Sequence, residues 1–397
     1  MARSVIVSAA RTAISKFGGA AADLPAVEFG ATAIKAAIER AGITGDQVDY
    51  VIMGQVLQAG TGQITARQAS IKAGVPETVP AITINKVCLS GLNAIAMADQ
   101  MIRAGEVDVV VAGGMESMDN APYLLPKARK GYRMGDGKLV DSMIYDGLWD
   151  AFTDKHMGGQ SDEVNTEFKI SREDQDAWSF RSHQRAATAI EEGRFKDEIV
   201  PLEVPQRKGD PVVFDTDEGV RAETTLESLA KLRTAFNKEG TITAGNASQI
   251  SNGGAAVVVM SEQRAQELGV TPIAEIVAHG MSADKPPYLH TVPALAIQAA
   301  CKKAGISAND IDLLEINEAF AAVALHSTRM LFNGNKEAEE KVNVNGGAVA
   351  LGHPIGATGA RLMVSLIHEL KRQGKTTGCA ALCGGGGQGD ALIVKIL

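Results

Sequence analysis

Cys88 has the surroundings expected of a reactive cysteine. Residues 81–84 read AITI, an alternation typical of a strand, and residues 94–105 predict a helix. Ser90 and Gly91 lie between them and permit a tight turn. Cys88 therefore precedes a helix N-terminus, where unpaired N–H groups and the positive end of the helix dipole favour a nucleophilic thiolate. The alternative, a small buried hydrophobic residue, is the commoner role of a lone cysteine.

The elements that would position Cys88 occur twice in the chain. Residues 31–51 read ATAIKAAIERAGITGDQVDYV, and residues 294–314 read ALAIQAACKKAGISANDIDLL. Each copy predicts an amphipathic helix closed by Ala-Gly, then a short connection and a strand. The spacing between the copies is too long for a solenoid. Because strands alternate with helices after both copies, we expect an α/β fold built from two similar halves that pack on each other.

The two halves differ by an inserted segment. We assign the N-terminal half to residues 1–118 and 250–270, the insertion to residues 119–249, and the C-terminal half to residues 271–397. The insertion is polar, holds both tryptophans, and contains a capped helix that follows Ser171. Insertions over a catalytic core commonly carry binding function, and contacts between subunits are an equally open alternative.

Composition excludes several classes of function. The chain of 397 residues carries a net charge of −8 and has 4% aromatic residues, which argues against a nucleic-acid partner. The four cysteines show neither disulfide-scaffold density nor zinc-site spacing, so we expect a reducing compartment and no metal. No apolar run reaches membrane-spanning length, and residues 4–9 alternate like a strand rather than a signal-peptide core. The C-terminus is not a peroxisomal address, so we expect a cytoplasmic protein without membrane association.

Three further stretches would converge with Cys88 if the halves pack as mirror partners. Residues 317–320 read NEAF, residues 343–356 read NVNGGAVALGHPIG, and residues 383–387 read CGGGG. In these motifs the sequence closely resembles the thiolase superfamily. The resemblance covers nearly the full length and includes the insertion. It implies the duplicated thiolase fold, in which two similar mixed β-sheet and helix halves pack as α-β-α-β-α layers with an inserted loop subdomain.

The resemblance implies a Claisen condensation of acyl-CoA thioesters and its reverse, thiolysis. Cys88 would take the acyl group as a thioester after His353 removes the thiol proton. Cys383 would then take a proton from the methyl carbon of a second acetyl-CoA. Asn317 would hold a water that, with His353, binds the enolate oxygen, and the N–H groups of Cys88 and Gly385 would bind the oxyanion. Each such donor is typically worth roughly 3 kcal/mol where negative charge develops.

The resemblance also implies a set of coenzyme A contacts. Arg221 and Ser228 would meet the nucleotide end, although a solvated surface arginine is the alternative for Arg221. The remaining implied contacts are His156, Met157, Phe236, Ala244, Ser248, Leu289, Ala319 and Phe320. Coenzyme A thioesters are substrates in this family, so the expected partners are acetyl-CoA, acetoacetyl-CoA and CoA, with no cofactor. Dimers or dimers of dimers are implied by the family, so we expect a homo-oligomer, with a homotetramer as the specific expectation.

One departure from the family pattern bears on specificity. Many short-chain members carry Met-Gly-x-Gly-Pro before the second repeat helix, whereas residues 288–293 read YLHTVP. Leu289 takes the place of the methionine, but the glycines are absent, which leaves the acyl-length preference open. The leading hypothesis is reversible condensation of two acetyl-CoA to acetoacetyl-CoA and CoA. The alternatives are a broader degradative 3-oxoacyl-CoA thiolase, a ketosynthase, disfavoured because Cys383 is present, and a non-catalytic acyl-CoA-binding protein.

Overall fold

One mixed sheet runs through the molecule and carries both halves of the chain. The computed structural model describes residues 3–397, so residues 1–2 of the predicted N-terminal half lie outside the described part. The main path of the sheet is, in spatial order, β4 (Ala81–Ile84), β3 (Tyr50–Gly54), β5 (Val109–Ser117), β13 (Ser251–Ser261), β1 (Ser4–Thr12), β14 (Ala274–Ala283), β17 (Gln388–Ile396), β16 (Thr377–Gly384) and β15 (Leu313–Ile316). The order β3-β5-β13-β1 of one half recurs in reverse as β14-β17-β16-β15 in the other.

The duplication extends to details of strand register. In the N-terminal half, the pairing of β1 with β13 shifts between Ile6 and Ser8. In the C-terminal half, the pairing of β14 with β17 shifts between Ile276 and Ala278. The half-sheets join where Val5 pairs with Glu275 in the antiparallel contact of β1 and β14. The repeat predicted from sequence is therefore a structural repeat, and a short strand contact makes its two sheets continuous.

The aspartates shared by the two repeats have the same structural task. Asp49 Oδ2 accepts hydrogen bonds from the backbone N–H groups of residues 108 and 109, at 2.9 and 2.8 Å. Asp312 Oδ2 accepts the equivalent bonds from residues 376 and 377, at 3.0 and 2.8 Å. Each carboxylate satisfies N–H groups that precede or begin the neighbouring strand, which explains why the repeat includes an aspartate there.

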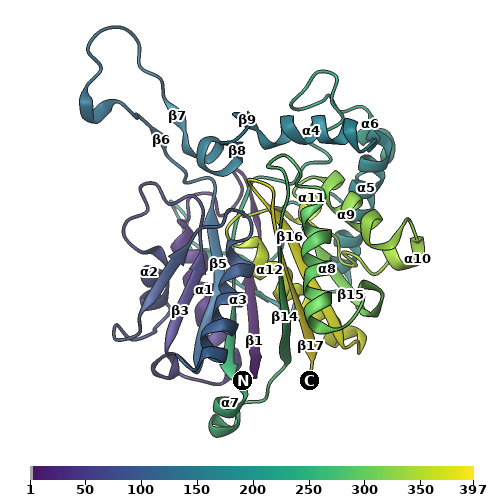
Figure 1. Cartoon of the computed structure of the whole chain (residues 1–397). Helices are drawn as coiled ribbons and strands as arrows, with labels where there is room; N and C mark the ends of the chain where they lie inside the picture. The colour runs from purple at the N-terminus through teal and green to yellow at the C-terminus, as the bar shows by residue number, and fades with distance from the viewer. Residues whose placement is uncertain (1–2) are drawn as a thin grey trace.

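Helices form three layers around the two half-sheets (Figure 1). The outer face of the N-terminal half-sheet is covered by α1 (Ala26–Ala41) and α2 (Thr65–Lys72), and that of the C-terminal half-sheet by α8 (Val292–Ala304) and α9 (Ala321–Phe332). Between the half-sheets lie α3 (Ser90–Ala104) and α12 (Thr358–Gln373). The predicted α-β-α-β-α layering is confirmed.

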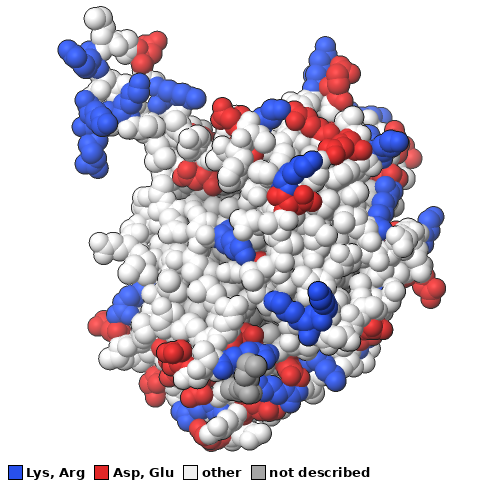
Figure 2. Space-filling view, viewed as in Figure 1, with Lys and Arg blue, Asp and Glu red and all other residues white. Residues whose placement is uncertain are grey.

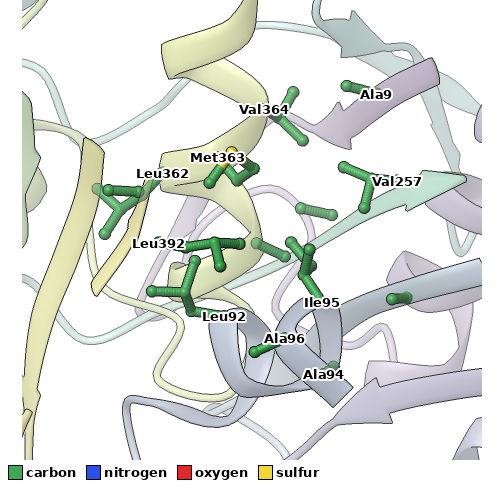
Figure 3. Packing of buried hydrophobic residues seen from close by; sticks show 14 of the residues in the cluster. Ala9, Leu92, Ala94, Ile95, Ala96, Val257, Leu362, Met363, Val364 and Leu392 are labelled. Carbon is green, nitrogen blue, oxygen red and sulfur yellow. The ribbon is translucent and has the colours of Figure 1, made fainter. Parts of the chain in front are cut away.

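The central layer forms a core shared by both halves. Figure 3 shows Leu92 and Ile95 of α3 beside Met363 of α12, with Val257 of β13 and Leu392 of β17 around them. All five side chains are fully buried, and burying each is worth about 1.5–3 kcal/mol. This packing holds the N-termini of α3 and α12 in one place, and those two helix starts carry the candidate catalytic residues.

The inserted segment caps the end of the sheet where the strands lead into the site. Its elements are β6 (Tyr123–Leu124), β7 (Val140–Asp141), the π-helix η3 (Met143–Leu148), β8 (Trp149–Asp150), β9 (Lys155–His156), α4 (Met157–Glu167), α5 (Arg172–Glu191), β10 (Ile199–Val200), β11 (Leu202–Val204), β12 (Val212–Phe214) and α6 (Leu226–Ala230). The predicted cap of α5 is present, because Ser171 Oγ accepts from Asp174 N at 3.0 Å. The β6-β7 hairpin projects from the body, and Lys and Arg side chains gather on it (Figures 1 and 2).

A buried ion pair fastens the insertion to the central strands. Arg11 of β1 is fully buried, and its Nε donates to Glu198 at 2.6 Å. Its Nη1 donates to Asp217 at 2.7 Å.

Within residues 3–397, no helix is both long enough and apolar enough to cross a membrane. The remaining short elements are β2 (Ser15–Lys16), α7 (Glu262–Leu268), α10 (Lys336–Glu339), α11 (Ala348–Leu351) and single 3-10 turns at Gly45–Gln47, Ala128–Lys130 and Ala308–Asp310.

Candidate active site

The turn before Cys88 is held by side-chain hydrogen bonds. Ser90 Oγ accepts from Lys86 N at 2.8 Å and donates to Val87 O at 2.6 Å. Val87 adopts φ of 52°, a left-handed conformation that β-branched residues rarely take and that costs about 1–3 kcal/mol. The predicted turn is therefore real, but Gly91 does not make it. A Cβ on Gly91 would lie 2.8 Å from the backbone N of Ala360, so this glycine instead lets α3 approach α12.

His353 is oriented to take a proton from Cys88. The His353 Nε2 lies 3.2 Å from Cys88 Sγ, and His353 Nδ1 lies 2.6 Å from Thr358 Oγ1. Thr358 Oγ1 donates its hydrogen to Pro354 O at 3.0 Å, so it accepts from His353 Nδ1–H. This tautomer leaves Nε2 unprotonated and directed at the thiol. Burial, aided by the charge of Arg361, lowers the pKa of His353 to about 3 and keeps the ring neutral.

Electrostatics around Cys88 favour the thiol over the thiolate. Burial raises the pKa of Cys88, and the nearby Cys383 and Glu116 raise it further. Burial therefore opposes the helix N-terminus, which by itself favours the thiolate. Cys88 and His353 thus form a neutral pair, in which the proton moves to His353 as the sulfur attacks.

Cys88, His353 and Cys383 line one pocket. Cys383 is 1% exposed, and burial raises its pKa to about 12. The pocket has a volume of about 40 Å³. By that measure a water needs roughly 10–15 Å³, so the space suits about three small atoms, the number of heavy atoms in an acetyl group. Its wall consists of Cys88, Leu148, His156, Met157, Ser248, Leu289, Ala319, Phe320, His353, Ile355, Cys383, Gly384 and Gly385.

Asn317 follows β15 and reaches the same histidine. Its Nδ2 lies 3.4 Å from His353 Nε2, and its side chain is fully buried. Within the described residues its Oδ1 has no hydrogen-bond partner. A buried amide oxygen without a partner is costly, and it is suited to accept a hydrogen bond from a bound water or ligand.

Most of the predicted coenzyme A contacts surround the pocket. Of the predicted set, those that line it are His156, Met157, Ser248, Leu289, Ala319 and Phe320. Phe236 stacks on His156 with ring centroids 4.6 Å apart and meets Phe320 edge-on at 6.2 Å. The insertion and the C-terminal half therefore share an aromatic wall beside Cys383.

Arg221, Ser228 and Ala244 do not line the pocket. All three are exposed on the insertion. The backbone N of Arg221 donates to His183 Nδ1 at 3.2 Å. Ser228 Oγ donates to Thr225 O at 2.7 Å within the capping box of α6. Their contact with coenzyme A remains a prediction.

Several residues in or beside the pocket were not predicted from the sequence. Thr358, which fixes the tautomer of His353, stands five residues beyond it at the start of α12. Leu148 and Ile355 reach the pocket from the π-helix and from the loop after His353. No group of three or more His, Cys, Asp or Glu side chains within residues 3–397 is arranged to hold a metal ion.

Glu116 was also missed, although a glutamate near the end of a buried strand is an unusual feature. It is fully buried and accepts backbone hydrogen bonds from Val56 at 3.0 Å, Leu57 at 3.1 Å and Gly356 at 2.9 Å. Burial raises its pKa to about 7 in spite of these donors. The carboxyl group therefore joins the loop that carries His353 to the segment after β3.

Comparison with known proteins agrees with this geometry. The family model for the thiolase N-terminal domain matches residues 4–263, and that for the thiolase C-terminal domain matches residues 270–396. The chain belongs to the thiolase family. This thiolase is 55% identical over 391 residues to a protein of Mycolicibacterium smegmatis named probable acetyl-CoA acetyltransferase, covering 98% of this chain and 100% of the relative.

Other relatives carry similar names. An acetyl-CoA acetyltransferase of Cupriavidus necator is 54% identical to this thiolase, and 98% of each chain is covered. The crystal structure of the Bacillus anthracis acetyl-CoA acetyltransferase superposes with a TM-score of 0.96 at 44% identity. That match covers 100% of this chain and 99% of the other, so the thiolase fold holds over the whole length.

Proposed function

We propose that this thiolase is an acetyl-CoA C-acetyltransferase, which condenses two acetyl-CoA to acetoacetyl-CoA and CoA and catalyses the reverse thiolysis. The observation that carries the proposal is the 3.2 Å contact between Cys88 Sγ and His353 Nε2 in a pocket that also contains Cys383. This pocket combines a neutral base, His353, with two buried thiols, Cys88 and Cys383, around a space of about the size of an acetyl group. Such a site suits acyl transfer followed by carbon–carbon bond formation.

The first half-reaction is acylation of Cys88. The sulfur attacks the thioester carbonyl while His353 Nε2 takes the thiol proton, and CoA leaves with a proton. Thr358 supports the transfer because it accepts from His353 Nδ1–H in both the neutral and the protonated ring. The N–H groups of Cys88 and Gly385 are proposed to bind the oxyanion, each worth roughly 3 kcal/mol.

The second half-reaction is proposed to use Cys383 as the base. Cys383 would give its own proton to the departing CoA sulfur, and its thiolate would then remove a proton from the methyl carbon of a second acetyl-CoA. The resulting carbanion would attack the acyl group on Cys88, and the released Cys88 sulfur would take back the proton held by His353. Asn317 and His353 would support the enolate oxygen, with a water between the amide and the substrate. The partnerless Oδ1 of Asn317 supports that water, since it offers a buried acceptor beside His353.

Binding of the CoA moiety is assigned to the insertion. Arg221 is proposed to meet the nucleotide, and Phe236, Ala319 and Phe320 to lie near the pantetheine. Ser228, Ala244 and Ser248 are proposed as further contacts. Exposed cationic side chains at the nucleotide end suit a phosphate ligand. No cofactor enters the proposed reaction.

A cytoplasmic homo-oligomer is the proposed setting. The projecting hairpin supports subunit contacts because its Leu125, Met134 and Leu139 are 49%, 94% and 59% exposed. Nucleic acid and membrane are not proposed partners of a chain with net charge −8. Sedimentation velocity of the full chain would distinguish a dimer or tetramer from a monomer.

Labelled acetyl-CoA tests the function directly. Incubation should place acetyl on the Cys88 peptide, and Cys88→Ala should abolish both labelling and acetoacetyl-CoA thiolysis. Cys379→Ala is the matched control, because this fully buried cysteine lies outside the pocket. Acetyl found on another cysteine, with none on Cys88, would contradict the proposal.

The alternative is a degradative thiolase of broader acyl range, favoured by the missing glycines around Leu289. Specificity constants for acetoacetyl-CoA and for a ten-carbon 3-oxoacyl-CoA decide between them. A value for the longer substrate that equals or exceeds that for acetoacetyl-CoA would favour the degradative activity.

A further inference from the structure

The loop that carries Leu289 is closed by its own hydrogen bonds. It joins β14 to α8 and occupies residues 284–291. Thr291 Oγ1 donates to Asp284 Oδ2 at 2.8 Å, so the two ends of the loop are linked. Asp284 N donates to Gly387 O at 2.8 Å, which fixes the loop against the glycine turn after β16. Leu289, which is 2% exposed, projects from this closed loop into the acyl pocket.

His290, next in sequence, connects the loop to two other elements. It is fully buried, and its Nε2 lies 2.9 Å from Asn165 Oδ1 of α4. Its backbone oxygen accepts from Ser327 Oγ of α9 at 2.7 Å. Asn165 Nδ2 donates to Thr241 Oγ1 at 3.0 Å, which leaves Oδ1 as an acceptor and makes His290 Nε2–H the donor. The other ring nitrogen has no partner within the described residues.

The helix that His290 contacts also borders the pocket. α4 begins at Met157, which lines the acyl pocket, and Asn165 lies two turns further along. Met157 and Leu289 therefore belong to the same pocket wall, and the bond between Asn165 and His290 joins their supporting elements. Burial lowers the pKa of His290 to about 3, so the ring stays neutral and the bond persists at physiological pH.

We propose that His290 is a specificity-determining positioning residue, which holds Leu289 against the acyl pocket through its bond to Asn165 and so limits the acyl group to a short chain. The inference rests on the proposed thiolase activity and adds the element that sets its substrate length. A glycine-containing loop could shape this wall by backbone flexibility, whereas this chain uses a buried imidazole–amide bond. His290 touches neither the substrate nor the reacting sulfurs, because it is not part of the pocket wall.

The test compares thiolysis of acetoacetyl-CoA and 3-oxohexanoyl-CoA. His290→Ala should raise the ratio of kcat/KM for the longer to the shorter substrate by about tenfold or more, chiefly through a lower KM for the longer one. His290→Gln should keep the ratio within about twofold of the unmodified protein, because its Nε can replace the donor. An unchanged ratio in His290→Ala, or the same ratio in the Ala and Gln variants, would overturn the inference.

Asn165→Ala removes the bond from its other side. It should shift the ratio as His290→Ala does, and the double variant should shift it no further, since both act through one contact. If His290→Ala does not fold, this variant decides alone, and an unchanged ratio in it overturns the inference. Tyr288→Phe is the matched control, because it removes the exposed bond from Tyr288 to Glu167 at 2.5 Å in the same loop and should leave the ratio unchanged. No thiolysis of acetoacetyl-CoA by the unmodified protein would instead contradict the proposed function.

Discussion

The thiol of Cys88 is neutral in the free protein. Cys88 is 4% exposed and faces a neutral imidazole, so neither solvent nor a cation stabilises its thiolate. A buried neutral pair avoids the cost of two desolvated charges in the resting protein. In the proposed mechanism, activation depends on proton transfer during attack, which requires His353 to present Nε2 without its hydrogen.

Alkylation kinetics should reveal this neutral pair. The pKa of Cys88 is raised above its ordinary value, so the thiolate fraction falls below that of a free cysteine at any given pH. We expect the rate of Cys88 alkylation by iodoacetamide to rise about tenfold per pH unit from about pH 7 to 9, without a plateau. N-acetylcysteine, as the control, should begin to level off near its own pKa of about 8.5. A plateau for Cys88 below pH 8 would show a stabilised thiolate and contradict this account.

Thr358 should matter to catalysis more than to folding. Thr358→Val keeps the side-chain volume but removes the acceptor for His353 Nδ1–H, so the ring can adopt the tautomer with Nε2 protonated. Loss of this hydrogen bond is worth about 1–3 kcal/mol, so the acylation rate should fall about ten- to hundredfold. Thr358→Ser retains the hydroxyl and should recover most of the rate. Equal rates for the Val and Ser variants would remove Thr358 from the mechanism.

The candidate catalytic residues could be predicted from the sequence, but the residues that orient them could not all be. Cys88, His353, Cys383 and Asn317 could be found because each lies in a motif, and the structure brings all four together. Thr358 does not lie in a recognisable motif, since a threonine near a glycine-rich turn is common. The protonation state of Cys88 could not be predicted either, because it depends on burial by distant segments.

The N-termini of two helices, α3 and α12, position the candidate catalytic residues. The predicted helix over residues 94–105 begins instead at Ser90, because the Ser90 hydroxyl bonds the backbone of the preceding turn. Local propensity favours a later start, since Ser and Gly are weak helix formers. Contact with α12 overrides that propensity, as the close approach of Gly91 to Ala360 demonstrates. The strand over residues 81–84 was predicted with its observed limits.

Gly91→Ala should push the N-termini of α3 and α12 apart. The new Cβ would lie 2.8 Å from Ala360 N and 3.0 Å from Gly356 O, and backbone atoms cannot move aside cheaply. We expect a loss of about 1–3 kcal/mol in the free energy of unfolding, together with slower acylation because Gly356 belongs to the loop of His353. Gly159→Ala in α4 is the matched control, since the nearest atom would be 3.8 Å away. Similar stability and acylation rates for the two variants would contradict the contact.

At the scale of the whole molecule, the site lies where the two repeats meet. Each half supplies one thiol and one helix start, and the repeated register brings them to the same end of the sheet. The duplication was visible in residues 31–51 and 294–314, so two similar α/β halves that pack on each other could be predicted from it, whereas the order of the layers came from the resemblance to thiolases. The contact of β1 with β14 could not, because it involves a pair of residues in each strand and leaves no pattern in the sequence.

An ion pair joins the two halves next to the turn that carries Cys88. Lys86, two residues before Cys88, places Nζ 2.9 Å from both carboxylate oxygens of Asp390 in β17. Asn93 Nδ2 also donates to Asp390, at 3.1 Å. Burial alone would raise the pKa of Asp390, but the contacts with His279 and Lys86 outweigh it and lower the pKa. This carboxylate therefore adds stability above its unfolded pKa, and the contribution is lost as the pH falls through its folded pKa.

The two partners of this pair should not be equally costly to remove. Lys86→Met leaves the fully buried carboxylate of Asp390 without its cation, whereas Asp390→Asn leaves a lysine whose side chain is 24% exposed and can turn to solvent. We expect Lys86→Met to lower the free energy of unfolding by about 3 kcal/mol, and Asp390→Asn to lower it by less. The double variant should be more stable than Lys86→Met alone, since it removes the unpaired charge. Urea unfolding at pH 7 measures all three, with Glu267→Gln of the exposed Arg264–Glu267 pair as a control expected to leave the free energy of unfolding unchanged. If Asp390→Asn destabilised the protein as much as Lys86→Met, the ion pair would not be the main contact here. The turn that carries Cys88 would then be held to the C-terminal half by the hydrogen bond from Asn93 and by the neighbouring strands.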